Sequence, residues 1–255
     1  LTAVYSRASG DYVRAQNPDG TFQPESYVFK EGGNFGGPRV DPTMDTLSFE
    51  DVSPVIARSL AARNYQESVD PATTKLLIVV YWGTTIGPED NSPQSSRESS
   101  QLTEWADAHW DTDPGHAAAL RAEAGGLRPM EAGIDGKIDA RSANILGYTD
   151  EIFRTSPHDP WMNTLRDEIE EDRYYVVLLA YDYQAARNQN ERRLLWETRF
   201  SVPERGNDFE KAFPMMASIA SKYFGQDSHG LVHHNLADGH VEVGEPRSLG
   251  TLPGK

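Results

Sequence analysis

Two neighbouring stretches, YYVVLLAYDY (174–183) and RRLLWETRFSV (192–202), decide the fold. The first is a nearly continuous run of apolar, β-branched and aromatic residues, which predicts a strand buried on both faces. The second stretch alternates, so we expect one solvated face carrying Leu195, Glu197, Arg199 and Ser201. The polar linker that starts at Gln184 is too short for a crossover helix, and it therefore predicts an antiparallel hairpin at the centre of a sheet.

Other apolar runs extend this sheet on the N-terminal side of the hairpin. They predict strands at 2–6, 27–30 and 75–82, and the glycines at 32–37 predict a loop after the second of these. The glycines lack the spacing of a phosphate-binding or dinucleotide-binding turn. The predicted sheet therefore carries no nucleotide signature.

Helical spacing of apolar residues predicts the covering layer. One helix begins at Ser48, with Asp51 at the capping-box position, and ends near Asn64. Another helix is expected from Asn163 to Asp172. A last helix is expected to begin at a cap on Asn207 or Asp208 and to end at Gly225. The expected fold is α/β (α+β): a two-layer sandwich with a mixed sheet and helices on one face.

The chain reads as a single domain, 1–255, with two additions. Residues 83–160 are polar and form an insertion with short helices, including apolar helical spacing at 140–154. Residues 226–255 lack a clear period and predict an extended tail that lies on the domain or reaches a neighbour.

Composition limits the classes of partner. The formal net charge of −15 disfavours nucleic acid and anionic membranes, because both require a positive surface. The longest apolar run, Leu76–Trp82, is far shorter than the roughly 20 residues of a membrane-spanning helix. The sequence has no cysteine, which excludes disulfides and thiol chemistry. The chain begins with Leu1, and we expect an exported protein, secreted or in the cell envelope, from which a signal peptide has been removed.

A histidine-rich stretch in the tail is the candidate metal site. His229, His233 and His234 lie close together, with His240 and several carboxylates nearby, and imidazole with carboxylate suits a divalent transition metal. The spacing matches no established zinc motif. Surface histidines without a metal are the alternative interpretation.

Two tryptophans in the insertion, Trp105 and Trp110, are candidate binding residues for a small ligand or glycan, since a polar segment gives them little core to join. Nucleophile signatures are missing from the sequence: no G-x-S-x-G elbow occurs, and serines concentrate in the polar insertion. We therefore favour a protein that is not an enzyme.

The order of these pieces resembles a known family. The segments AVYS, YVF, FEDVSPVIARSLAARNY and KLLIVVYWG are followed by VVLLAYDYQ and LLWETRF. This pattern, over residues 1–82 and 174–224, resembles the domain of unknown function 4136 and related uncharacterised exported bacterial proteins. The resemblance implies a mixed sheet with helices on one face, in the envelope or outside the cell, and it assigns no catalytic residue. The chain lacks the lipid-anchor cysteine of that family.

Two classes of function follow. The first is a non-enzymatic structural or binding protein of the bacterial envelope or exterior that acts as a homo-oligomer or polymer, or by contact with another envelope protein. The alternative is a metal-dependent hydrolase or a module that binds a small ligand or glycan. The insertion carries the candidate binding residues and the tail carries the candidate metal ligands, so the positions of these two parts relative to the hairpin distinguish the two classes of function.

Overall fold

The computed structural model describes residues 1–36, 47–85 and 140–235. These residues form one seven-stranded mixed sheet in the order β3-β2-β4-β5-β6-β1-β7. The α/β fold class predicted from the sequence is confirmed. No helix in the described ranges is long and apolar enough to cross a membrane.

The central hairpin is confirmed. β5 (Arg173–Asp182) and β6 (Leu194–Pro203) pair antiparallel, and β5 is buried along nearly its whole length. The polar linker between them contains a short helix, α8 (Tyr183–Gln189), whose N-cap is Asp182. β4 (Leu76–Thr84) pairs antiparallel with the other edge of β5.

The remaining strands complete both sides of the sheet. β2 (Glu25–Gly36) runs parallel to β4 and to β3 (Tyr65–Glu67). β2 continues through the glycines at 32–36, so the predicted loop does not begin at Gly32. The strand accommodates these glycines by a shift of its register with β4 between Glu31 and Gly33. On the far side β1 (Thr2–Ala8) pairs antiparallel with β6, and β7 (Val232–His234) pairs antiparallel with β1.

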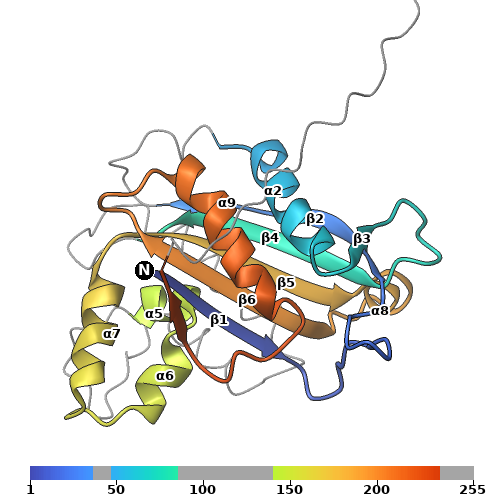
Figure 1. Ribbon diagram of the computed structural model, residues 1–255. Coiled ribbons are helices and arrows are strands. Elements are labelled where there is room, and N and C mark those ends of the chain that lie inside the picture. The colour runs from blue at the N-terminus through green and yellow to red at the C-terminus, as the bar shows by residue number, and fades with distance from the viewer. Residues whose placement is uncertain (37–46, 86–139, 236–255) are drawn as a thin grey trace, which may run out of the picture.

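Two helices cover one face of the sheet (Figure 1). α2 (Phe49–Ala61) has the predicted capping interaction, in which the Asp51 carboxylate accepts a hydrogen bond from the backbone N–H of Ser48. α9 (Phe209–Ala220) begins at the predicted cap Asp208, and the 3₁₀ turn η1 (Ser221–Tyr223) extends it. These helices bury apolar residues against Trp82, Trp196 and Phe200 in the larger core.

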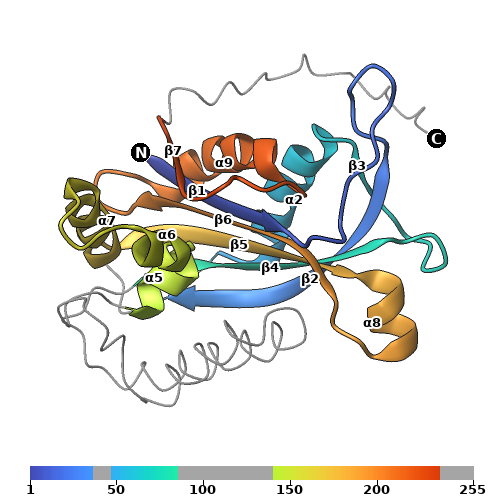
Figure 2. The same ribbon diagram turned by 90° about the horizontal axis from the view of Figure 1, so that it is seen from below.

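Helices also cover the opposite face of the sheet (Figure 2). The sequence predicted helices on one face, and the structure has them on both. α5 (Ala140–Leu146), α6 (Thr149–Arg154) and α7 (Pro160–Glu170) bury a second core against β5, β6 and β1. α7 begins at the Asp159 cap and not near Asn163, because Pro160 is tolerated in the first turn, where its missing N–H has no partner to lose.

Candidate functional site

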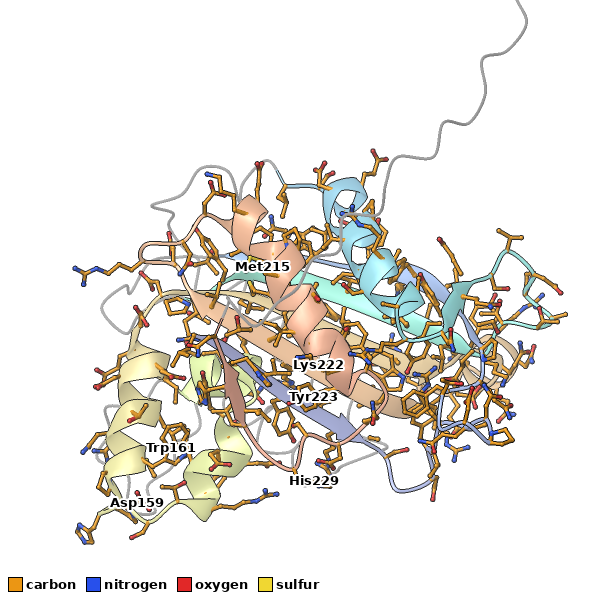
Figure 3. All side chains as sticks on the ribbon, viewed as in Figure 1. Asp159, Trp161, Met215, Lys222, Tyr223 and His229 are labelled. Carbon is orange, nitrogen blue, oxygen red and sulfur yellow. The ribbon has the colours of Figure 1, made fainter. Side chains whose placement is uncertain are left out.

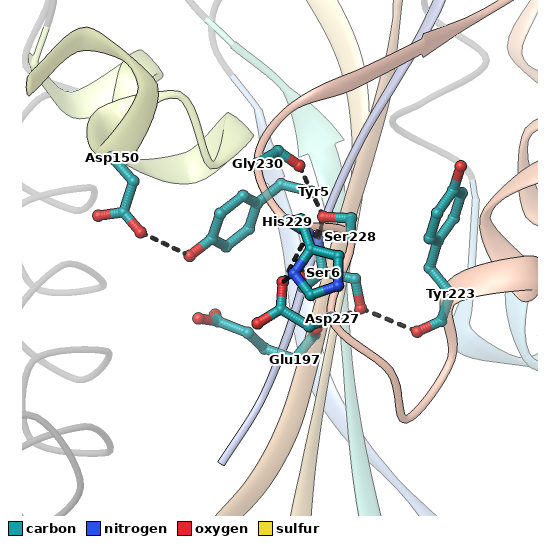
Figure 4. Close-up of polar contacts among 9 residues, drawn as sticks. All are labelled: Tyr5, Ser6, Asp150, Glu197, Tyr223, Asp227, Ser228, His229 and Gly230. Atoms are coloured by element: carbon teal, nitrogen blue, oxygen red, sulfur yellow. Dashed lines mark hydrogen bonds and ion pairs between the residues drawn. The ribbon is translucent and has the colours of Figure 1, made fainter. Parts of the chain in front are cut away.

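The segment 227–234 closes the outer edge of β1. Ser228 N–H donates to the carbonyl of Ser6 (2.9 Å), and Ser6 N–H donates to the Ser228 hydroxyl oxygen (2.9 Å). Ser228 Oγ also lies 2.6 Å from the carbonyl oxygen of Gly230 (Figure 4). Farther along, Thr2, Ala3 and Val4 are in register with His234, His233 and Val232. The beginning of the predicted tail therefore adds a strand to its own sheet.

The side chain of His233 lies against the second face of the sheet. Its Nε2 donates to Glu168 Oε2 at 2.9 Å, and its ring meets the ring of Trp161 edge-on at 5.3 Å. Glu168 Oε2 also accepts a hydrogen bond from the Tyr148 hydroxyl at 2.5 Å. Burial alone would raise the pKa of the Glu168 carboxyl, but the hydrogen bonds from His233 and Tyr148 outweigh burial and lower this pKa.

The other two candidate metal ligands point elsewhere. His234 Nε2 and the Tyr223 hydroxyl are joined by a hydrogen bond of 2.9 Å on the side of α9. His229 is exposed at the rim of the loop before β7, whereas Trp161 is on α7 and Tyr223 is at the end of α9 (Figure 3). Among the described residues no group of three histidine, cysteine or carboxylate side chains converges on a metal position. The metal site at His229, His233 and His234 stays a prediction, and the structure does not bring these three side chains together.

Asp227, Ser228 and His229 are consecutive but do not form a catalytic arrangement. Nucleophilic catalysis by serine requires a hydrogen bond between the hydroxyl and a base. The Ser228 hydroxyl instead interacts with backbone groups of Ser6 and Gly230, and His229 pairs with Asp227, whose Oδ1 is 3.5 Å from His229 Nδ1. The three residues shape a turn.

A layer of charged groups is buried between the sheet and α5. Arg199 Nη2 is 2.7 Å from Glu197 Oε2, and the Arg199 guanidinium also donates to the backbone carbonyl of Asn144. The side chains of Arg199 and Glu197 are only 2% and 8% exposed. The prediction that Glu197, Arg199 and Ser201 lie on a solvated face is therefore wrong, because α5 and its neighbours cover that face of β6.

Arg173, on β5, is a second buried cation. Its Nε donates to the Ser201 hydroxyl at 3.1 Å, and its Nη1 is 3.7 Å from a carboxylate oxygen of Glu171. Its positive charge contributes to the lowered pKa of Glu168. The polar layer thus continues from the β1–β6 pair to the residues that hold His233.

A small cavity opens at the edge of this layer, between β1, β6 and the α5–α6 turn. Tyr5, on its wall, donates its hydroxyl hydrogen to Asp150 Oδ2 at 2.9 Å (Figure 4). Burial, followed by the negative charges of Glu197 and Asp150, raises the pKa of the Tyr5 phenol well above its ordinary value. Gly147 makes the turn with φ of 81°, and a Cβ there would lie 2.7 Å from the Cβ of Tyr5.

Sequence reasoning missed most of these polar residues. Asn144 and Glu168 stand alone in otherwise ordinary helices, and no local pattern marks them. Glu197 and Arg199 did carry a signal, since opposite charges two residues apart on one strand face can neutralise each other in a buried position. Trp105, Trp110 and His240, which the sequence suggested as binding or metal residues, lie outside the described residues.

Comparisons with known proteins give a distant likeness of shape. No family model and no curated protein matches the chain. Among solved structures, a crystal structure of a PDZ domain protein from Parabacteroides distasonis is similar, with 10% sequence identity and a TM-score of 0.42. The match covers 91% of this chain and 38% of that one, so this chain spans well under half of the length of its structural neighbour. The resemblance to the domain of unknown function 4136 stays an expectation.

Proposed function

We propose that this protein is a non-enzymatic structural or binding protein of the bacterial envelope or exterior, and that it assembles by exchanging residues 230–234 between copies. The envelope or exterior location rests on the sequence resemblance. The assembly rests on one observation: β7 (Val232–His234), within the 227–234 segment, occupies the β1 edge as an added strand. Strand addition of this kind is a general mode of protein recognition, in which backbone hydrogen bonds supply affinity and alternate side chains supply specificity.

The contacts of the segment have the form of a recognition surface. Backbone groups of Ser6 and residues 2–4 pair with the segment, and three side chains enter different environments. His233 contacts Trp161 and Glu168, Leu231 joins the second core, and His234 contacts Tyr223. The β1 edge of a second copy presents the same groups, so residues 230–234 donated to it would make the same contacts. Asp227 and Ser228 stay on their own chain, where Ser228 pairs with Ser6, and His229 is then the hinge.

The turn that folds the segment back onto its own chain is strained. His229 has φ of 59°, in the left-handed region, which costs a non-glycine residue roughly 1–2 kcal/mol. Donation to a neighbour lets this turn open and relieves that strain. Short hinge loops under strain favour domain swapping, and reciprocal exchange gives a dimer whereas head-to-tail exchange gives a ring or filament.

Light scattering coupled to size-exclusion chromatography tests this function on the full chain. We expect masses at integral multiples of the monomer, increasing with protein concentration. The variant His229→Gly removes the strain from the folded-back turn, because glycine adopts positive φ readily. It should lower the oligomeric fraction. A wild-type protein that stays monomeric at high concentration would contradict the proposal.

A further inference from the structure

The side chain of His233 is bound by two residues of α7. Its Nε2 donates to Glu168 Oε2 at 2.9 Å, and its ring stands at 88° to the ring of Trp161, with 5.3 Å between the ring centres. The side chains of His233 and Glu168 are only 16% and 15% exposed, so water has little access to this hydrogen bond. We call His233, Trp161 and Glu168 the latch.

The two latch residues on α7 are held in place by other parts of the domain. The Tyr148 hydroxyl donates to Glu168 Oε2 at 2.5 Å. The indole Nε1 of Trp161 donates to Glu151 Oε1 at 3.3 Å, and the backbone N–H of Trp161 donates to the carboxylate of the Asp159 cap at 2.9 Å. None of these partners belongs to the exchanged segment. The binding position for the imidazole therefore stays formed when the segment leaves.

The backbone holds the segment over a short length. β7 pairs with β1 over the three residues Val232–His234, so few ladder hydrogen bonds resist its release. A hydrogen bond to a carboxylate is about twice as strong as one between neutral groups, such as that of His234 with the Tyr223 hydroxyl. The contact of His233 with Glu168 is therefore a large part of what must break before the segment leaves its edge.

We propose that the latch sets the rate at which residues 230–234 pass between copies, whereas the His229 hinge sets the balance between monomer and oligomer. This inference rests on the proposed function. The latch forms the same contacts on the β1 edge of its own chain and on that of another copy, so it stabilises both states equally. Its contacts must break in either direction, and a contact that is lost in the transition state controls the rate. The left-handed backbone of His229 strains the folded-back state, and the hinge therefore affects the equilibrium.

The test follows the mixing of subunits in the full chain. Oligomers of unlabelled protein and of protein with a heavy-nitrogen label are combined, and native mass spectrometry records the mixed species over time. His233→Ala removes both latch contacts and should accelerate mixing about tenfold or more, because a hydrogen bond to a charged group is lost. The oligomeric fraction at equilibrium should change by less than about twofold. His229→Gly should show the reverse pattern, a lower oligomeric fraction with an unchanged rate of mixing.

Two further variants separate the latch from a general effect on stability. His233→Phe keeps a ring beside Trp161 and removes the hydrogen-bond donor, so it should accelerate mixing less than His233→Ala does. His158→Ala, at an exposed histidine before α7, is the matched control and should mix at the wild-type rate. If wild-type copies form no mixed species, the exchange itself is wrong, and this inference with it. Mixing of His233→Ala at the wild-type rate, or an oligomeric fraction that shifts as much as the rate, would overturn the latch and leave the exchange standing.

Discussion

The guanidinium of Arg199 and the carboxylate of Glu197 form an ion pair of 2.7 Å that is buried within a single strand. Both residues lie on the face of β6 that packs beneath α5, and Arg199 also donates to the Asn144 carbonyl. The pair therefore joins the central hairpin to the second helical layer. Its burial means that each charge depends on the other for neutralisation.

Arg199→Met should destabilise the protein strongly, by about 3–5 kcal/mol, because Glu197 would remain buried without its partner. The double variant Arg199→Met with Glu197→Leu removes both charges and should lose much less. Chemical denaturation of the two variants measures the difference in the free energy of unfolding. Equal losses in the single and the double variant would show that the pair is not coupled.

Gly147→Ala should cost more than a change at another left-handed glycine. Gly147 has φ of 81°, and its Cβ would collide with Tyr5, whereas Gly206 has nearly the same φ, 80°, with no atom within 4 Å of its Cβ. Gly206→Ala therefore reports the backbone cost alone, about 1–2 kcal/mol. Thermal unfolding should show a larger loss for Gly147→Ala, and similar losses for both would contradict the close contact with Tyr5.

Arg14→Lys should be destabilising although the charge is kept. The Arg14 guanidinium carbon lies 4.3 Å from the ring centre of Phe22 and 3.9 Å from that of Tyr65, and lysine lacks the planar group that stacks on such rings. We expect a loss of about 1–2 kcal/mol in the free energy of unfolding. Arg193→Lys, at an exposed pair with Asp11, is the control and should change it by less than about 0.5 kcal/mol.

The Glu168 carboxyl should make stability depend on pH in the acid range. Its pKa is lowered in the folded protein, so its contribution is present above the unfolded value of about 4.3 and is lost as pH falls through the folded value. Glu168→Gln should remove this part of the pH dependence when unfolding is measured from pH 7 to pH 2. The exposed Glu210→Gln variant is the control at pH 7, where it should stay within about 0.5 kcal/mol of wild type. An unchanged acid profile in Glu168→Gln would argue against the hydrogen bonds from His233 and Tyr148.

Periodicity was enough to predict the hairpin, the strands β1 and β4, and the cap at Ser48, and it narrowed the last cap to Asn207 or Asp208, because these features depend on neighbouring residues. It could not predict that β6 is covered on both faces. The helices that cover Glu197 and Arg199 come from residues far away in the sequence. The local sequence pattern of a polar residue buried in this way is the same as that of an exposed residue. The same limit applies to the candidate site, since Tyr5 meets Asp150, and Arg199 meets Asn144, only through the fold.

The histidines illustrate a second limit. Their closeness in sequence suggested one site, but alternate residues of a strand point to opposite faces. His233 and His234 therefore contact α7 and Tyr223 respectively, on different sides of the sheet. A cluster in sequence becomes a cluster in space only when the local structure turns the side chains together.

Disulfide trapping of strand exchange tests the central claim most directly. The chain has no cysteine, so Val4→Cys with Val232→Cys introduces two thiols at positions in register between β1 and β7. Val4 is fully buried, which means that a bridge between two chains at this position requires strand pairing. Val232→Cys alone is the control for random collisions of thiols.

After oxidation of the double variant at high protein concentration, non-reducing electrophoresis and peptide mass spectrometry identify the bridged chains. We predict covalent dimers or larger ladders joined by residue 4 of one copy and residue 232 of another, beyond what the single variant gives. Bridges found only within single chains at every concentration would contradict assembly by exchange of residues 230–234.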